Sequence, residues 1–505
     1  MKRLFLLPLL AAMTSVSAQE SLDTAIVAAI RDQAFHHSQV MDIAFHLTDV
    51  SGPRLSNSPG LARAQQWAKQ ALNSWGLENV ALEPWGTFGD GWELQKCYLA
   101  LKEPYYQPIP CSPLAWTQGS GGPFEAEVAI YDPKDSAEQA ALRGKLNGKL
   151  VVFSGHKAIA PSFEPMATRY ADSDLEKIMA PYPPIVQPPV KKTTPSPPPP
   201  PRPRRPRMVN TIDFFQQEGV LGMLSPSRYN DGLVVEAGGS HQTGKPLGPM
   251  RLILSKDDYD RIVRLLESGT KVVLEGDVQT RRITADSIGY NVIGEIPGTD
   301  PRLKDQLVML GGHLDSWPSS TGATDNGAGA SVMLEVVRIL ESLHISPRRT
   351  IRVALWSGEE QGLLGSRAYV RNHFGDPKTR TWTPAQAKVS AYYNLDNGTG
   401  RIRGIYLQGD SAAGPVFAPW LASFADLGAT AVTIRNTGGT DHQSFESVGI
   451  PGFQFIQDPI EYYNRTHHSN LDAYDHLLPE DLEQAAAIVA AFVYETAMRQ
   501  EPIPR

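Results

Sequence analysis

The spacing of hydrophobic positions predicts that the chain has three parts. In residues 55–75 apolar side chains recur at helical spacing, and the pair Ser58-Pro59 is a typical helix start. Between about residues 110 and 283, short apolar runs alternate with Gly-rich turns, which predicts a β-rich part with one helix at 256–266. From Tyr290 onward the pattern changes to strand, loop and helix in repeated order.

The repeated order in the last part predicts an α/β fold, with a mostly parallel sheet and helices on both of its faces. Apolar runs mark the expected strands and one long helical stretch, at residues 307–310, 351–356, 389–395 and 453–456 and at residues 332–343. The longest apolar run near the C-terminus, residues 485–494, is shorter than the ~20 residues that a membrane-spanning helix needs. We therefore expect a buried helix there and no transmembrane segment.

The chain length supports more than one folded unit. Its 505 residues exceed the ~250 to 300 residues at which a single core usually stops growing. We expect residues 19–109 and 284–505 to form one domain, which residues 110–283 interrupt. Residues 1–18 combine two basic residues, an apolar stretch and a Val-Ser-Ala end, which is typical of a secretory signal. The protein is therefore expected to be secreted or periplasmic.

Composition narrows the choice of partners. Thirteen of the 41 Pro lie in residues 181–206, so we expect a disordered Pro/Arg-rich loop at 181–207 inside the middle part. A net charge of −7 provides no overall attraction to nucleic acid. Two Cys cannot build a four-Cys zinc site. Whether Cys97 and Cys111 form a disulfide stays open, because sequence does not show their geometry.

Polar groups follow each expected strand of the last part. They are His313 and Asp315, Glu359 and Glu360, Asp396, and His467 and His468, while Asp325 begins the helical stretch. One such group is weak evidence, since a His after a strand is more often structural and a Glu pair is usually solvated. In an α/β sheet, however, the carboxyl ends of the strands share one edge. Imidazoles and carboxylates gathered there, without thiols, suit a hydrolytic zinc site.

The ordered motifs carry a resemblance. GGHLDS, GATDNGAG, WSGEEQGLLGS, NLD, GGTDHQSF and HHSNLD together resemble metallopeptidase family twenty-eight, the dinuclear zinc exopeptidases. The resemblance covers residues 290–500 closely and residues 55–75 loosely. The middle part resembles the protease-associated domain that is inserted in some members of this family.

The resemblance implies two zinc ions and five ligands: Asp325 between the ions, His313 and Asp396 on one side, and Glu360 and His468 on the other. His468 is preferred to His467 because His-Ser-x-x-Asp fits the family pattern. Glu359 would act as general base, and Asp315 would orient His313 through a hydrogen bond.

By the same analogy the Asp325–Asn326 peptide bond is expected to be cis. Two further groups of residues have open roles. The motif GGTDHQSF supplies either walls of the pocket or a shaped loop, through Asp441, His442 and Phe445. Tyr462 and Tyr463 supply either an oxyanion donor or packing.

We therefore expect a secreted exopeptidase that hydrolyses dipeptides or short peptides, as a carboxypeptidase or dipeptidase with two zinc ions per chain. An aminopeptidase is the main alternative. A glutaminyl cyclase and a non-catalytic binding homologue are less favoured, because the insert and the complete set of ligands and base agree with a peptidase. The expected partners are peptide substrates, not nucleic acid, and a homodimer stays open.

Overall fold

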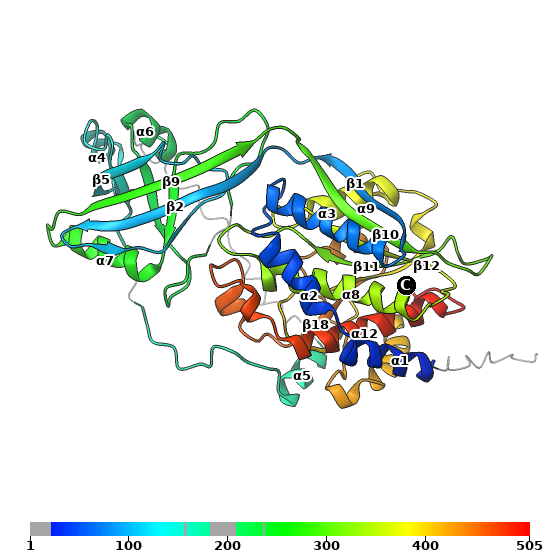
Figure 1. Cartoon of the computed structure of the whole chain (residues 1–505). Helices are drawn as coiled ribbons and strands as arrows, with labels where there is room; N and C mark the ends of the chain where they lie inside the picture. Colours follow the sequence, from blue (N-terminus) through cyan, green and yellow to red (C-terminus); the bar gives the residue numbers. More distant parts are fainter. Residues whose placement is uncertain (1–21, 156–158, 182–208, 236–237) are drawn as a thin grey trace, which may run out of the picture.

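The structure is a computed structural model that describes residues 22–155, 159–181, 209–235 and 238–505. The expected signal at 1–18 lies outside the described residues, as does the expected Pro/Arg-rich loop apart from Pro181. Figure 1 shows a large body, which we call the main body, and a smaller one at the end of a long strand pair.

The main body is built on an eight-stranded sheet. Its order is β1 (Glu78–Thr87), β10 (Ile288–Ile296), β12 (Thr350–Trp356), β11 (Leu307–His313), β15 (Val389–Asn394), β18 (Gly452–Gln457), β16 (Ile402–Tyr406) and β17 (Ala431–Thr433). The central strands β12, β11, β15 and β18 are parallel. β1, β10 and β16 run antiparallel to a neighbour, so the sheet is mixed, with a parallel centre.

Helices cover both faces of this sheet, as expected. One face carries α1 (Thr24–His36), α2 (Val40–Phe45), α3 (Pro59–Ser74), α8 (Ala328–Ser342), α10 (Gly414–Ala422) and α12 (Pro479–Met498), and the other carries α9 (Leu364–His373) and α11 (His442–Glu446). The alternation of side chains along β11 explains the two layers. Val308 and Leu310 pack into the first core, whereas Met309 packs into the second.

Two predicted helices are confirmed in detail. α3 begins after Ser58, whose side chain accepts a hydrogen bond from the backbone N of Leu61 at 3.2 Å. α12 includes the apolar run at 485–494 and is buried along most of its length. Among the described helices, none combines the length and the apolar character that crossing a membrane requires.

Residues 88–287 lie between β1 and β10, which are neighbours in the sheet, and we call them the insert. Its own sheet has the order β3 (Gln107–Pro108), β2 (Gly91–Glu103), β9 (Val273–Ile283), β5 (Pro123–Ile130), β6 (Leu150–Val152), β7 (Gly222–Pro226), β8 (Arg251–Leu254) and β4 (Cys111–Pro113). Its helices include α4 (Ser136–Ala141), α6 (Thr211–Glu218) and α7 (Lys256–Glu267).

The insert starts earlier than the boundary expected at residue 110. β2 begins at Gly91 and pairs with β9 over its length, so it belongs to the second sheet. β2 has no clear alternation of buried and exposed positions, which explains why its pattern gave no signal. The Sγ atoms of Cys97 and Cys111 lie 3.4 Å apart as free thiols.

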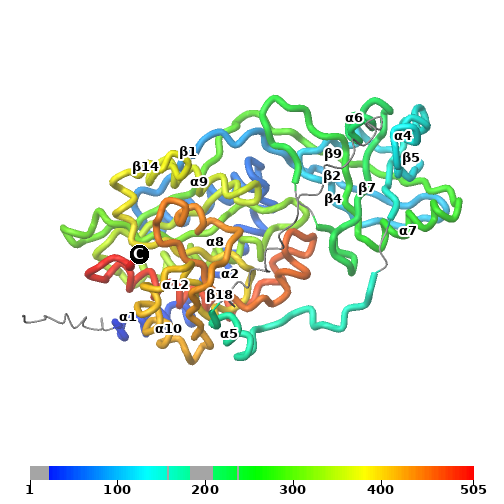
Figure 2. The backbone as a smooth tube through the Cα atoms, turned by 180° about the vertical axis from the view of Figure 1, so that it is seen from behind, coloured from blue at the N-terminus to red at the C-terminus, as the bar shows by residue number. Residues whose placement is uncertain are grey.

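One segment of the insert returns to the main body. Residues 166–180 include α5 (Asp172–Met179), which lies beside the main body in both views (Figures 1 and 2). Leu175 packs there against Ala431 and Ile456. The two bodies therefore meet at a second place, besides the strands that connect them.

Candidate metal centre

The sheet brings the candidate ligands to one edge, as expected. His313 is the last residue of β11, Glu359 and Glu360 follow β12, and Asp396 follows β15. His467 and His468 lie on the loop after β18. These segments converge because the four strands are parallel and neighbouring.

Asp325 lies at the centre of the cluster, and its two carboxylate oxygens face different partners. Oδ1 is 3.3 Å from His313 Nε2, while Oδ2 is 3.2 Å from His468 Nε2. On the first side His313 Nε2 is also 3.5 Å from Asp396 Oδ1. On the second side His468 Nε2 is 2.9 Å from Glu360 Oε2. The five residues thus form two sets that share one carboxylate.

The backbone around Asp325 is fixed by side chains from distant segments. The Asp325–Asn326 peptide bond is cis, as predicted. Asn326 Nδ2 donates to the carbonyl of Leu395, and Asn326 Oδ1 accepts from Gly329 N. A Cβ atom at Gly329 would lie 2.1 Å from the Leu395 carbonyl oxygen, so only glycine permits this close approach. Asp325 is thereby held beside the strand end that carries Asp396.

The cluster has the properties of a metal site. Among the described residues, Asp325 Oδ2 and Glu360 Oε1 are buried and have no hydrogen-bond partner, although Oδ2 lies 3.2 Å from His468 Nε2. Buried polar atoms are nearly always paired, so orphaned ones point to a ligand. Two overlapping groups have donor atoms close enough for a metal ion: His313 with Asp325 and Glu360, and Asp325 with His467 and His468. Nitrogen and oxygen donors without thiols fit zinc.

Asp315 hydrogen-bonds to His313 through its backbone and uses its carboxylate elsewhere. The ring of His313 donates through Nδ1 to the backbone carbonyl of Asp315 at 2.9 Å, while the carboxylate Oδ1 is 3.7 Å away. That carboxylate accepts instead from the backbone N atoms of Glu359 and Glu360, at 3.2 and 3.3 Å, and from the Ser56 hydroxyl. The carbonyl therefore fixes the His313 tautomer, with Nε2 free to bind a metal. The carboxylate anchors the Glu pair.

The two adjacent glutamates point to different sides. Glu360 contacts His468, whereas Glu359 Oε2 lies 3.9 Å from His313 Nε2. Burial raises the pKa of Glu359 well above its ordinary value, and the neighbouring carboxylates of Asp396 and Asp441 raise it further. Burial and Asp325 raise the pKa of Glu360 to about 7. The geometry thus separates the two residues, which spacing alone did not do.

Charge interactions across the cluster are strong. Burial alone would lower the pKa of His313, but Asp396 and Glu359 raise it well above its usual value. Burial also opposes the charged form of His468, yet Glu360 and Asp325 raise its pKa to about 10. A cation at this place is therefore strongly favoured, because several buried carboxylates face each other.

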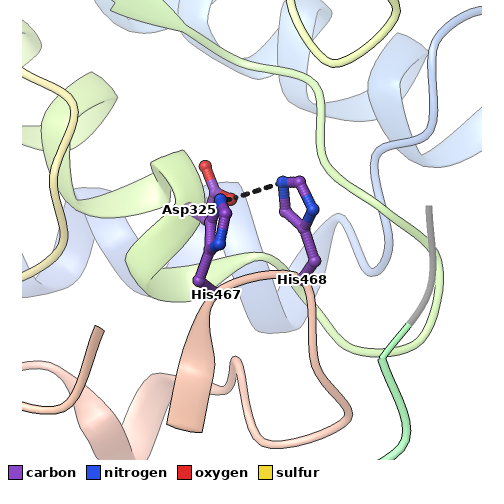
Figure 3. A group of neighbouring side chains, drawn as sticks. All are labelled: Asp325, His467 and His468. Atoms are coloured by element: carbon purple, nitrogen blue, oxygen red, sulfur yellow. Dashed lines mark ion pairs between the residues drawn. The ribbon is translucent and has the colours of Figure 1, made fainter. Parts of the chain in front are cut away.

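The two neighbouring histidines both face Asp325 (Figure 3). His467 Nε2 lies 3.6 Å from Asp325 Oδ2, compared with 3.2 Å for His468. Only His468 also contacts Glu360 within ion-pair distance among the described residues. This extra contact supports the choice of His468 as the ligand, with His467 at the wall of the site.

A cavity of about 520 Å³ opens over the cluster. Tyr462 and Tyr463 line it, and the Tyr463 hydroxyl donates to Asn397 at 2.7 Å. Asp441, His442 and Phe445 are buried behind the lining loop at residues 437–440, so they shape this loop and do not form the inner wall. His442 Nε2, for example, contacts Gln408 at 3.0 Å.

Two supporting residues had no assigned role in the sequence. Asp472 accepts hydrogen bonds from the backbone N atoms of Thr324 and Asp325. It is the Asp of the His-Ser-x-x-Asp pattern, so its motif provided a signal. Arg54 is fully buried and donates to the carbonyls of Leu314 and Gly322. No pattern in the sequence marks Arg54, because a single Arg before a helix is ordinary.

Comparison with known proteins agrees with this geometry. Peptidase family M28 matches residues 291–493. Carboxypeptidase Q of Bos taurus is 27% identical over 464 residues, which cover 91% of this chain and 85% of the relative. Carboxypeptidase Q of Homo sapiens is 26% identical over 465 residues, with the same coverage. Aminopeptidase YwaD of Bacillus subtilis is 33% identical over 269 residues, which cover 52% of this chain and 54% of the relative.

Solved structures share the fold. A peptidase M28 precursor from Shewanella amazonensis has a TM-score of 0.66 at 23% identity, covering 95% of this chain and 98% of its own. A zinc aminopeptidase from Bacillus subtilis has a TM-score of 0.56 at 20% identity, covering 91% and 95%. The chain is thus similar to peptidase family M28 over residues 291–493 and to carboxypeptidase Q over most of its length.

Proposed function

We propose that the protein is a zinc-dependent exopeptidase that cleaves dipeptides or short peptides as a carboxypeptidase or dipeptidase. The observation that carries the proposal is the shared carboxylate of Asp325, whose oxygens face two separate sets of ligands. We propose two zinc ions per chain, with His313 and Asp396 holding one, Glu360 and His468 holding the other, and Asp325 contacting both. The similarity to carboxypeptidase Q over most of the chain supports this assignment.

Zinc at this site supplies Lewis acidity, which acidifies a water molecule and polarises the scissile carbonyl. Glu359 takes the proton of the attacking water and returns it to the leaving amine. Burial raises its pKa above the ordinary value, which favours uptake of a proton by this carboxylate. Asp315 holds the backbone N atoms of Glu359 and Glu360, and thereby keeps the base and the ligand pointing to different sides.

The lining of the cavity favours substrates with a free carboxylate. Among the described residues that line it, Arg367 is the one lysine or arginine. One of its nitrogens donates to the carbonyl of Gly362, and its other N–H groups make no hydrogen bond or ion pair with the described residues. A guanidinium binds a carboxylate through paired hydrogen bonds. We therefore assign Arg367 as the anchor for the C-terminal carboxylate of the substrate.

An aminopeptidase is the second candidate, because a bacterial aminopeptidase shares 33% identity with about half of the chain. A non-catalytic homologue is disfavoured, since all five proposed ligands and the base are brought together. For the remaining expectations, we propose that residues 1–18 direct secretion and that the insert is a protease-associated domain.

The deciding experiment is hydrolysis of matched peptides with identification of the products by mass spectrometry. The set contains free dipeptides, N-blocked peptides and C-terminal amides, and the Glu359→Gln variant serves as the inactive control. We expect cleavage of substrates with a free carboxylate and poor cleavage of the amides. Efficient cleavage of amides together with rejection of N-blocked peptides would establish the aminopeptidase. Zinc-loaded protein that cleaves none of them would overturn the proposal.

A further inference from the structure

We propose that the insert positions the ligand His468, through contacts with the loop at residues 460–470, here called the histidine loop. Tyr229 and Asn470 are the proposed positioning residues. This inference rests on the proposed metal centre. It assigns the insert a part in building the zinc site of the main body.

The insert forms backbone and side-chain hydrogen bonds with the histidine loop on the C-terminal side of His468. Val235 and Ser469 form an antiparallel β-bridge. Val234 N donates to Asn470 Oδ1 at 2.8 Å, and Asn470 N donates to the Val234 carbonyl at 2.9 Å. The bridge lies one residue after His468, and the two hydrogen bonds lie two residues after it. The direction in which the chain leaves His468 is therefore set by the insert.

The insert also forms hydrogen bonds with the histidine loop on the N-terminal side of the two histidines. The Tyr229 hydroxyl donates to the backbone carbonyl of Tyr463 at 2.8 Å. Asn464 Nδ2 donates to the carbonyl of Met166 at 2.9 Å. Residues of the insert thus hold both ends of the short stretch that carries the histidines.

The segment at 166–170 provides a third, charged anchor. Thr168 and Ile460 exchange two backbone hydrogen bonds of 2.9 Å. Arg169 forms ion pairs with Asp458 at 3.0 Å and with Asp481 at 2.6 Å. Both carboxylates are nearly fully buried, and removing one partner of such a pair is costly. The start of the histidine loop is therefore firmly tied to the insert.

The ring of His468 also contacts the insert indirectly, through Trp317. It packs at 6.0 Å against Trp317, which in turn meets Trp116 of the insert at 6.3 Å in an edge-on arrangement. His468 has a backbone φ of 60°, which is unfavourable for a residue other than glycine. Such a conformation persists only where the surroundings impose it. The surroundings of His468 include the insert, which contacts its loop at three places along the chain.

The test compares two single variants, Tyr229→Phe and Asn470→Ala, with Tyr106→Phe as the matched control on an exposed face of the insert. Metal-free protein is titrated with Co²⁺, and the visible absorption of the bound ion reports the ligand geometry. Loss of a hydrogen bond made directly to a metal ligand typically weakens metal binding by about 10- to 100-fold. The bonds of Tyr229 and Asn470 lie one step further from the metal, so this range is the upper bound for both variants. We expect weaker binding of the ion at the His468 side in both variants, with a shifted spectrum, and no change for Tyr106→Phe.

Wild-type affinity and an unchanged spectrum in both variants would overturn the inference. Tyr229→Phe removes only a hydroxyl, so it decides the matter alone if Asn470→Ala does not fold. A wild-type protein that fails to bind a second Co²⁺ would instead defeat the proposed metal centre. The two failures are therefore distinguishable.

Discussion

The two halves of the proposed metal centre are supported in different ways. His313 ends a central strand and its side chain is 1% exposed, so the hydrogen bonds of the sheet fix it. His468 lies on an irregular loop, is 17% exposed and has a left-handed backbone conformation. Its position depends on contacts with the insert. A single site can thus combine a rigid half, which the sheet builds, with a half that a second body completes.

The largest expected effect concerns the base between these halves. Glu359→Gln keeps the size of the side chain but cannot accept the proton of water. General-base catalysis typically contributes about 10²- to 10⁴-fold, so we expect kcat/KM to fall by roughly 10³-fold or more. The zinc content should stay at the wild-type value. Near-normal turnover on the same dipeptides would remove Glu359 from this role.

The adjacent histidines allow a matched test of the loop half. We expect His468→Ala to lose one of the two zinc ions, because it removes the nitrogen that contacts Glu360 and Asp325. His467→Ala should retain both ions and lose less activity. Zinc per chain is measured by mass spectrometry after equilibrium dialysis. If His467→Ala loses the ion and His468→Ala keeps it, the two assignments must be exchanged.

A smaller and more selective effect is expected at the substrate anchor. A hydrogen bond to a charged group contributes about 1.5 to 3 kcal/mol, so Arg367→Ala should raise KM for free dipeptides by roughly 10-fold or more. C-terminal amides should be unaffected. Arg371→Ala is the control, because this residue lines the adjoining cavity and not the one over the metal centre. An equal change for acids and amides would contradict the assignment.

The smallest expected effect is a change in the Tm at Glu446, in the main body and away from both halves of the metal centre. Burial raises the pKa of Glu446 to about 7 from an ordinary value of 4.5. The native state therefore holds this proton more tightly than the unfolded chain, and stability is lost as the pH rises from about 4.5 to 7. We expect Glu446→Gln to raise the Tm at pH 8 but not at pH 4. The exposed Glu501→Gln is the control, and an equal shift at both pH values would contradict the expectation.

The rigid half of the site was predictable from sequence, whereas the contacts that hold the histidine loop in the other half were not. The apolar runs of β11, β12 and β15 are long and buried, so the polar residues at their ends stand out. The mixed character of the sheet did not show, because the antiparallel strands β10 and β16 have no sequence signature of their own. The motifs pointed to the histidine loop but left the choice between His467 and His468 to family analogy.

The contacts of the insert are beyond sequence reasoning for a physical reason. Tyr229 and Tyr463 are 234 positions apart, and their bond joins a side chain to a backbone carbonyl. A backbone acceptor carries no residue preference, so no pattern records it. The buried Arg54 is a similar case, since all its partners near the metal centre are carbonyls. Asp315 also shows this limit, because its backbone, not its carboxylate, holds His313.

The central claim is that Asp325 joins two metal sites, and zinc binding at equilibrium tests it most directly. Metal-free protein is dialysed against buffered zinc, and bound zinc per chain is measured beside the Asp325→Ala variant. We predict saturation at two zinc ions per chain for the wild type and a loss of both high-affinity ions in the variant, because each oxygen of Asp325 serves one set of ligands. Saturation of the wild type at one ion or none would contradict the account.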